Sequence, residues 1–259
     1  MQAHFDTSDL IQGGTKIAIG LALAIAGFVF GIVSTVVAAN VLYALGVPVD
    51  TSPSIQIALT VVMFQGVSFG SVALVYLKLR GLGLDFIKAR FPTLRDLAWA
   101  VGGFISFVVL IMVIGLILSF LGIESASNQI EEIGKRNPEI FLLMIPFSFL
   151  LIGPGEELLF RGVIQGTLRE FFKPISGIVL ASLIFAVGHW EALGGGFQQR
   201  LVYIGVVFVL SLILGTVYEK TENLVVPALI HGAYNALLFY AMYVLYSAEP
   251  GSTAFILPF

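Results

Sequence analysis

Cysteine is absent from this sequence of 259 residues, so disulfides, thiolate nucleophiles and cysteine-based zinc sites are all excluded. Charge is scarce as well: 11% of the residues are charged, against about 25% in soluble proteins, and 58% are hydrophobic. The net charge of −3 gives no indication of nucleic acid as a partner. A composition this apolar predicts a membrane protein.

Long apolar runs recur along the chain, and a helix needs about 20 predominantly apolar residues to cross a bilayer. The first 15 residues lack the basic segment of a signal peptide and are predicted to form a short polar tail. The sequence therefore predicts an all-α fold, a polytopic transmembrane helical bundle of seven to eight spans, as a single membrane domain over residues 1–259. An eighth span would arise if one segment were split or re-entrant. The predicted spans are residues 17–45, 55–77, 97–121, 139–172, 175–190, 201–218 and 224–246.

The distribution of basic residues predicts which side of the membrane each loop faces. The loop that runs from Lys78 to Arg95 contains five Lys or Arg residues and one Asp. Basic loops stay on the cytoplasmic side, so we expect this loop to be cytoplasmic in a multi-pass protein of the cell membrane. The mainly acidic loop of residues 122–138 is then predicted to lie outside.

A cluster of charged residues lies inside the fourth span. Residues 153–155 read Gly-Pro-Gly, which predicts a helix break or kink. Glu156, Glu157 and Arg161 follow. Each charge at the centre of a bilayer costs about 2.5–3.5 kcal/mol on insertion scales. Charges kept at that cost usually face a bundle interior or a water-filled cavity, and they indicate a functional site.

The spacing within this cluster predicts different roles for the two acids. Adjacent helical residues point about 100° apart, so Glu156 and Glu157 are not expected to share a role. Arg161 lies four residues after Glu157, at ion-pair spacing, and five after Glu156. We therefore expect Arg161 to neutralise Glu157 and to leave Glu156 free for chemistry. The alternative is that all three form a structural ion network.

A height argument brings His189 to the level of the acids. The turn between the fourth and fifth spans is centred near Lys173, and Glu157 and His189 each lie 16 residues from it. In an antiparallel helical hairpin both positions lie about 24 Å from the turn. Phe185, one helical turn before His189, is predicted to pack as a wall beside the site. The alternative for His189 is a hydrogen bond between helices.

His231 and Asn235 are the remaining candidates for the site. They lie four residues apart and share a face of the last span, in a stretch without Lys, Arg, Asp or Glu from residue 224 to residue 248. Such a pair can simply join helices through hydrogen bonds. With Glu156 and His189, however, the set supplies what water activation needs. A carboxylate accepts a proton, an imidazole orients the water and a neutral donor stabilises an oxyanion.

The candidates form three motifs in order on apolar helices: Glu156-Glu157-x-x-x-Arg161, Phe185-x-x-x-His189 and His231-x-x-x-Asn235. This pattern resembles the CPBP (CAAX protease and bacteriocin-processing) family of intramembrane endopeptidases, also called the Abi family, to which the type II CAAX prenyl endopeptidase belongs. The resemblance divides the chain into variable N-terminal spans, residues 1–137, and a catalytic CPBP core, residues 138–246. Nothing in the N-terminal part adds to the match.

The resemblance implies an intramembrane endopeptidase that hydrolyses a peptide bond with an activated water. By analogy with the family, Glu156 and His189 activate the water, whereas His231 and Asn235 form the oxyanion site. The implied partners are the lipid bilayer and a peptide or protein substrate, which includes prenylated peptides, and not nucleic acid. The supporting residues are Glu157, Arg161 and Phe185.

Dependence on a metal ion is left open by the resemblance, because the family has been described both as metal-dependent and as glutamate-type. Zinc needs about three protein ligands, which Glu156, His189 and His231 could supply. The usual H-E-x-x-H pair on one helical face is missing. We therefore expect a glutamate-type mechanism without a cofactor, with zinc as the alternative.

Two other functions fit the same residues. A proton-coupled transporter or channel also uses intramembrane acids and histidines, and the Gly-Pro-Gly segment resembles a broken transporter helix. The sequence shows no paired inverted repeat to support this alternative. The other alternative is a non-catalytic membrane scaffold of the same fold.

Overall fold

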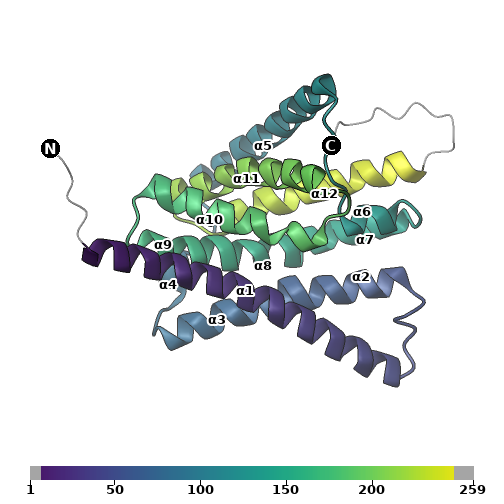
Figure 1. Ribbon diagram of the computed structural model, residues 1–259, viewed down its shortest axis with the longest axis horizontal. Helices are drawn as coiled ribbons and strands as arrows, with labels where there is room; N and C mark the ends of the chain where they lie inside the picture. Colours follow the sequence, from purple (N-terminus) through teal and green to yellow (C-terminus); the bar gives the residue numbers. More distant parts are fainter. Residues whose placement is uncertain (1–6, 248–259) are drawn as a thin grey trace.

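Long helices make up most of the computed structural model, which describes residues 7–247 (Figure 1). Several of them follow one another without a loop, so that α-helical and π-helical stretches alternate within one rod. In chain order the elements are α1 (Thr7–Ala44), α2 (Pro53–Val61), η1 (Val62–Phe69), α3 (Gly70–Leu79), α4 (Leu84–Ile87), α5 (Leu94–Leu121), α6 (Gln129–Gly134), α7 (Glu139–Phe147), η2 (Ser148–Ile152), α8 (Gly153–Glu157), η3 (Leu158–Gln165), α9 (Gly166–Arg169), α10 (Pro174–Gly188), η4 (Trp190–Ala192), α11 (Phe197–Thr221) and α12 (Val225–Ser247).

The predicted polytopic, all-α architecture is confirmed. Within the described part of the chain, seven helices are long and apolar enough to cross a membrane, and each corresponds to a predicted span. The second span joins α2, η1 and α3, and the fourth joins α7 through α9. The fifth span consists of α10 and the short η4. The eighth span that we considered is not found among these residues.

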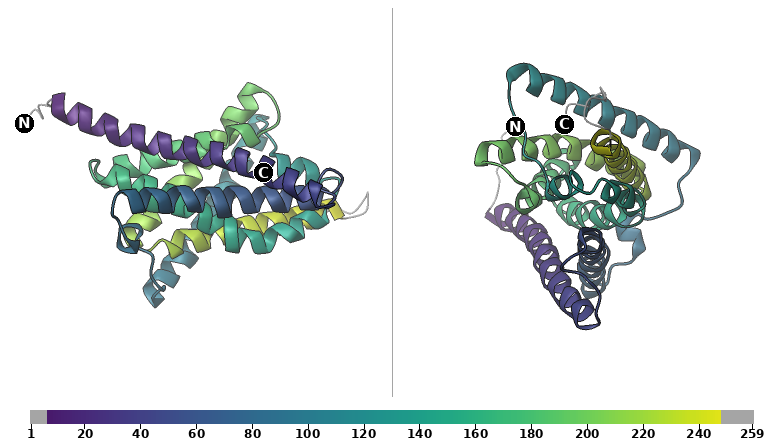
Figure 2. Two further views of the ribbon diagram at one scale, coloured as in Figure 1. Left: turned by 90° about the horizontal axis from the view of Figure 1, so that it is seen from below. Right: turned by 90° about the vertical axis from the view of Figure 1, so that its right-hand side faces the viewer.

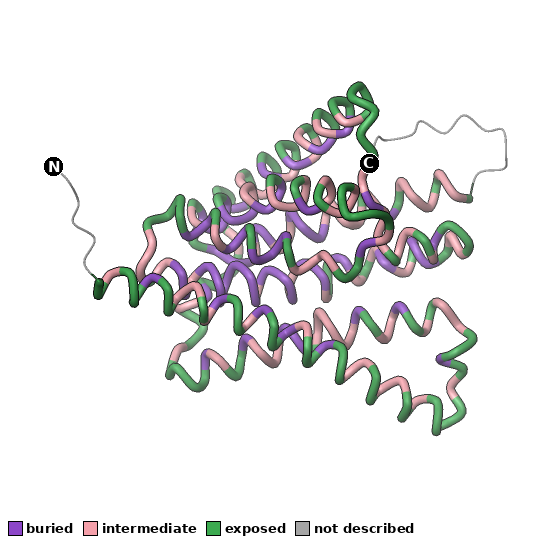
Figure 3. Tube along the Cα trace, in the orientation of Figure 1, coloured by how far each residue is buried: buried purple, intermediate pink, exposed green. Residues whose placement is uncertain are grey.

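The helices pack in layers around the fourth span. Figure 2 shows α1 together with α2 and α3 on one side of the bundle, and α5 crossing the opposite side. Buried residues gather on the central helices, whereas the outer faces of α1 and α5 are largely exposed (Figure 3). These outer faces are apolar: Val29 on α1 and Phe120 on α5, for example, are exposed. Exposed apolar faces are what contact with lipid requires, and the charged residues lie inside or at the ends.

The first helix begins earlier than the composition suggested. Helix α1 starts at Thr7, so most of the segment that was predicted to be a polar tail is helical; residues 1–6 lie outside the described part of the chain. The ammonium group of Lys16 forms an ion pair with Glu170, at the end of the fourth span. The helix therefore extends beyond the apolar run. Polar residues in this extension, such as Lys16, contact other parts of the bundle.

One end of the bundle is rich in ion pairs, both within the predicted cytoplasmic loop and its adjoining helix and between segments far apart in the sequence. Arg90 pairs with Asp96 at 2.6 Å, and the same carboxylate caps the start of α5 through Thr93. Lys88 lies 2.5 Å from Glu222, and its hydrogen bond holds the pKa of that carboxyl below its ordinary value. These contacts tie the predicted cytoplasmic loop to the ends of the later helices.

Of the two alternatives predicted at Gly-Pro-Gly, a break or a kink, the break is wrong, because the fourth span continues as a helix through all three residues. Gly153 has φ −53° and ψ −58°, within the right-handed helical region. Proline normally clashes with the carbonyl four residues earlier. Here the π-type turns of η2 widen the helix immediately before Pro154, which makes room for the ring and bypasses the missing N–H.

The two glycines of this segment allow close contact between helix backbones. A Cβ atom on Gly155 would lie 2.1 Å from the carbonyl oxygen of Gln65 in η1. A Cβ atom on Gly153 would lie 2.6 Å from the carbonyl oxygen of Ala228 in α12. The fourth span therefore touches the second span on one side and the seventh on the other. This close packing brings residues of three helices to one level.

We expect the substitution Gly155→Ala to destabilise the fold by about 1–3 kcal/mol, as overpacking commonly does, because the obstacle is backbone and not a flexible side chain. Gly102→Ala in α5 is the matched control, since a Cβ atom there meets nothing within 4 Å. That control should leave stability unchanged or raise it slightly, because alanine is the better helix former. Equilibrium unfolding in detergent measures both. Equal stability of the two variants would contradict the close-packing interpretation.

Candidate active site

Glu157 forms the buried centre of the charged cluster. Its side chain and that of Arg161 are completely inaccessible, and Arg161 Nε lies 3.0 Å from Glu157 Oε2 as an ion pair without hydrogen-bond geometry. Arg161 Nη2 also donates a hydrogen bond to Ser211 Oγ on α11, at 3.0 Å. The pairing that the spacing predicted therefore forms, and Ser211 adds a partner that the sequence did not indicate.

His231 joins this pair from the seventh span. Its Nδ1 lies 2.9 Å from Glu157 Oε1. An ionised carboxylate only accepts hydrogen bonds, so this contact assigns the proton to Nδ1. In the neutral ring Nε2 then carries a lone pair, and in the protonated ring both nitrogens donate. Glu157 thus fixes the orientation of the imidazole.

Glu156 occupies a different environment from that of Glu157. It is buried, but it has no contact with Arg161 within ion-pair distance. Its Oε1 accepts a hydrogen bond from Gln65 Nε2 at 3.3 Å. Its Oε2 has no hydrogen-bond partner in the described part of the chain and lies 3.8 Å from His231 Nε2. That distance is too long for a direct hydrogen bond.

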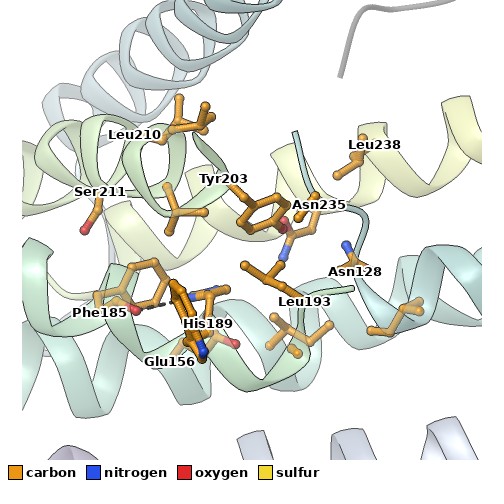
Figure 4. A pocket seen from close by; sticks show the side chains of 18 of the residues that line it. Asn128, Glu156, Phe185, His189, Leu193, Tyr203, Leu210, Ser211, Asn235 and Leu238 are labelled. Atoms are coloured by element: carbon orange, nitrogen blue, oxygen red, sulfur yellow. Dashed lines mark hydrogen bonds between the residues drawn. The ribbon is translucent and has the colours of Figure 1, made fainter. Parts of the chain in front are cut away.

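His189 lies at the end of α10, where the helix gives way to η4. Its Nδ1 is 3.0 Å from the carbonyl oxygen of Phe185, and this carbonyl can only accept, so Nδ1 carries the proton (Figure 4). The Nε2 of the neutral ring therefore has a lone pair. Both His189 and Glu156 line one cavity.

The ring of Phe185 packs against three polar side chains of the site. Its ring centroid lies 4.7 Å from that of His189 and 6.0 Å from that of His231, with edge-to-face geometry in both cases. The guanidinium carbon of Arg161 lies 4.9 Å from the same ring. The phenyl ring therefore separates the two imidazoles and shields the ion pair from the cavity, as expected of a packing wall.

Asn235 lies one turn after His231 on α12 and lines the same cavity. It is partly exposed, and its side chain makes no hydrogen bond to any residue that the structure describes. Figure 4 shows it together with Asn128 and Tyr203 among the residues that border the cavity. A free amide in this position can donate to a bound ligand.

The cavity has a volume of about 1330 Å³ and is bordered by all seven spans. Most of its lining is apolar: Phe28 and Ile32 come from α1, Ile111 and Leu118 from α5, and Leu210 from α11. Glu156, His189, His231 and Asn235 are among its polar lining residues. Figure 4 shows the labelled acid and imidazole on the same side of the cavity. The space therefore combines an apolar chamber with a small polar end.

Two loops that are distant in the sequence are paired at one end of the cavity. The loop before α6 and the loop after η4 meet in an antiparallel bridge between Asn128 and Leu193, and both residues line the cavity. Further hydrogen bonds join Gly194 N to Ser127 O at 2.9 Å and Gln199 Nε2 to Glu124 Oε2 at 2.9 Å. The paired loops cover this end of the chamber.

The donors do not form a ready metal site. Among residues 7–247 no group of three or more His, Cys, Asp or Glu side chains is arranged to hold a metal ion. The predicted zinc ligands Glu156, His189 and His231 therefore do not form such a group either. One nitrogen of His231 already contacts Glu157, and its other nitrogen lies 3.8 Å from Glu156. We therefore derive no chemical step through a metal.

The site thus brings together all seven residues that the sequence singled out, by direct contacts or by the shared cavity. Sequence reasoning missed Gln65 and Ser211, which contact Glu156 and Arg161 respectively. The available signal for Gln65 was a lone amide inside an otherwise apolar span. No comparable signal marked Ser211, because a single serine is ordinary in a membrane helix.

Comparison with known proteins supports the resemblance that the motifs indicated. Residues 138–237 match the family model described as "Type II CAAX prenyl endopeptidase Rce1-like", and this range contains all three motifs. An uncharacterized protein of Bacillus subtilis (strain 168), YpbD, is 36% identical over 114 residues, which are 42% of this chain and 53% of YpbD. The chain thus spans about half the length of this curated relative. No solved structure matches the chain.

Proposed function

We propose that this chain, whose residues 138–237 match the Rce1-like family of CAAX prenyl endopeptidases, is an intramembrane endopeptidase of the glutamate type. The observation that carries the proposal is the position of Glu156 Oε2. This oxygen is buried, has no hydrogen-bond partner among the described residues and lies 3.8 Å from an imidazole nitrogen. A carboxylate in that state is a ready acceptor for a water proton.

In the proposed reaction Glu156 and His189 activate a water. Glu156 Oε2 takes a proton as the water oxygen bonds to the carbonyl carbon of the substrate. The lone pair on His189 Nε2 accepts the second water hydrogen as a hydrogen bond and orients the attack. When the C–N bond breaks, the proton passes from Glu156 to the leaving amine, and the new carboxylic acid keeps the water oxygen with its second hydrogen.

The oxyanion that forms during the attack needs donors. We assign this role to His231 and Asn235. Protonated His231 donates through Nε2, because Nδ1 is engaged with Glu157. Asn235 supplies its free side-chain amide from one turn further along α12. Glu157, held in turn by Arg161, stabilises the imidazolium and keeps the ring in place.

The substrate that fits the cavity is a peptide within or at the membrane. The apolar chamber extends from the polar end between α1, α5 and α11, which suits an apolar chain attached to the peptide, such as a prenyl group. We place the protein in the cell membrane as a multi-pass protein, with the loop from Lys78 to Arg95 in the cytoplasm. Residues 138–246 form the catalytic core, the variable spans of residues 1–137 complete the chamber, and nucleic acid is not a partner.

Incubation of the purified protein with reporter peptides tests this function. A prenylated peptide and its unprenylated counterpart should both be offered, with and without a chelator. We expect cleavage with a higher kcat/KM for the prenylated peptide and no effect of the chelator. Equal rates for both peptides would remove the prenyl preference. Loss of activity with chelator, restored by zinc, would overturn the metal-free mechanism.

A further inference from the structure

Gln65 lies beside the proposed catalytic glutamate although it belongs to the second span, outside the region that matches the family model. Its Nε2 donates a hydrogen bond to Glu156 Oε1 at 3.3 Å. The residue borders the same cavity as Glu156, and it lies in the π-helical stretch η1. Single π-helical stretches within α-helices are frequent at functional sites.

The orientation of the Gln65 amide follows from the charge it faces. An amide oxygen turned towards an ionised carboxylate would be repelled, so the nitrogen is the end that contacts Glu156. The amide oxygen, Oε1, is then buried and has no hydrogen-bond partner in the described part of the chain. A buried polar atom without a partner lowers stability. Stability therefore does not explain the presence of an amide here.

The backbone around Gln65 is held on two sides. Its carbonyl oxygen is the atom that a Cβ on Gly155 would approach to 2.1 Å, so η1 and α8 are in direct backbone contact. On the other side Ser68 Oγ donates a hydrogen bond to the carbonyl oxygen of Gly27 in α1. Phe69 packs edge-to-face on Phe160 of the fourth span, with ring centroids 5.8 Å apart. The amide is thus presented to Glu156 by a fixed scaffold.

We infer that Gln65 is a positioning residue for peptide hydrolysis, holding one oxygen of Glu156 so that the other faces His231 and the attacking water. The inference rests on the proposed function. Without the amide the carboxylate is free to rotate about its terminal bond, and the oxygen that takes the proton loses its fixed direction. A displacement of about 1 Å at a reacting group can cost a factor of about 100 in rate.

The variant Gln65→Met tests this role, because methionine has a similar length and lacks the amide donor. We expect kcat to fall about 10-fold to 100-fold, with KM and the unfolding midpoint unchanged. Gln56→Met is the matched control: Gln56 lies on the same span and is exposed, and within residues 7–247 its side chain bonds only to the carbonyl oxygen of Asp50. Its kcat should equal that of the wild-type protein. Gln65→Glu keeps the shape and replaces the donor with a second carboxylate, so its kcat should fall at least as far.

The outcomes separate the inference from the function it rests on. A wild-type protein that cleaves no peptide would defeat both. Cleavage by the wild-type protein with an unchanged kcat in Gln65→Met or Gln65→Glu would overturn the positioning role alone. A change in KM without a change in kcat would make Gln65 a substrate contact instead. A parallel loss of kcat and unfolding midpoint in Gln65→Met would reduce its role to packing.

Discussion

Replacing Glu156 with glutamine should reduce the rate of peptide cleavage by about 10²-fold to 10⁴-fold, the usual contribution of a positioned general base. Glutamine keeps the shape of the side chain but cannot take a proton from water. The protein should remain folded, because Oε2 makes no hydrogen bond to any residue within 7–247 and Arg161 pairs with Glu157 instead. Single-turnover cleavage of a reporter peptide measures the loss, and the unfolding midpoint checks the fold.

Glu139→Gln is the matched control for this prediction. Glu139 is exposed at the start of the same continuous helix, far along the chain from the polar cluster. The same chemical change there should leave the rate unaltered. If Glu156→Gln cleaves the peptide as fast as the control does, Glu156 is not the general base. If a biological role is kept while cleavage is absent even in the wild-type protein, the chain acts as a scaffold.

The second large effect concerns stability and not the reaction. Arg161→Met should destabilise the protein by about 3–5 kcal/mol, because it leaves the buried carboxylate of Glu157 without its counter-ion. Neither side chain of this pair is accessible. Equilibrium unfolding in mixed micelles measures the change, with circular dichroism to show that the starting state is helical.

Lys135→Met provides the control for the buried pair. Lys135 forms ion pairs with Glu131 and Glu132 at the surface, and exposed pairs contribute about 0–1 kcal/mol. The double variant Arg161→Met with Glu157→Gln should recover part of the lost stability, because no uncompensated charge remains. A loss for Arg161→Met no larger than that for Lys135→Met would show that the pair is not desolvated in the membrane.

Local physical chemistry made much of the fold predictable from the sequence. The number of spans followed from the length of the apolar runs, because each helix must satisfy its own backbone in lipid. The pairing of Glu157 with Arg161 followed from their spacing of four residues on one helix. The three motifs indicated the family, whose model matches residues 138–237.

Contacts between segments that are distant in the sequence could not be read in the same way. Gly-Pro-Gly is a local signal for a break, yet the helix continues because π-type turns accommodate the proline and the neighbouring helices need glycine at their contacts. The link between His231 and Glu157, at 2.9 Å, joins residues 74 positions apart. The hydrogen bond from Gln65 to Glu156 spans 91 positions.

The sequence by itself determined which segments are helices that can cross a bilayer, which charges share a helical face, and which family part of the chain resembles. These properties depend on neighbours within a turn or two and on the length of apolar runs. Only the tertiary structure decided that His231 contacts Glu157, that Gln65 reaches Glu156 from the second span, and that two loops pair over one end of a common cavity. The reason is that helix packing, set by glycines and side-chain shape across the bundle, fixes which faces meet.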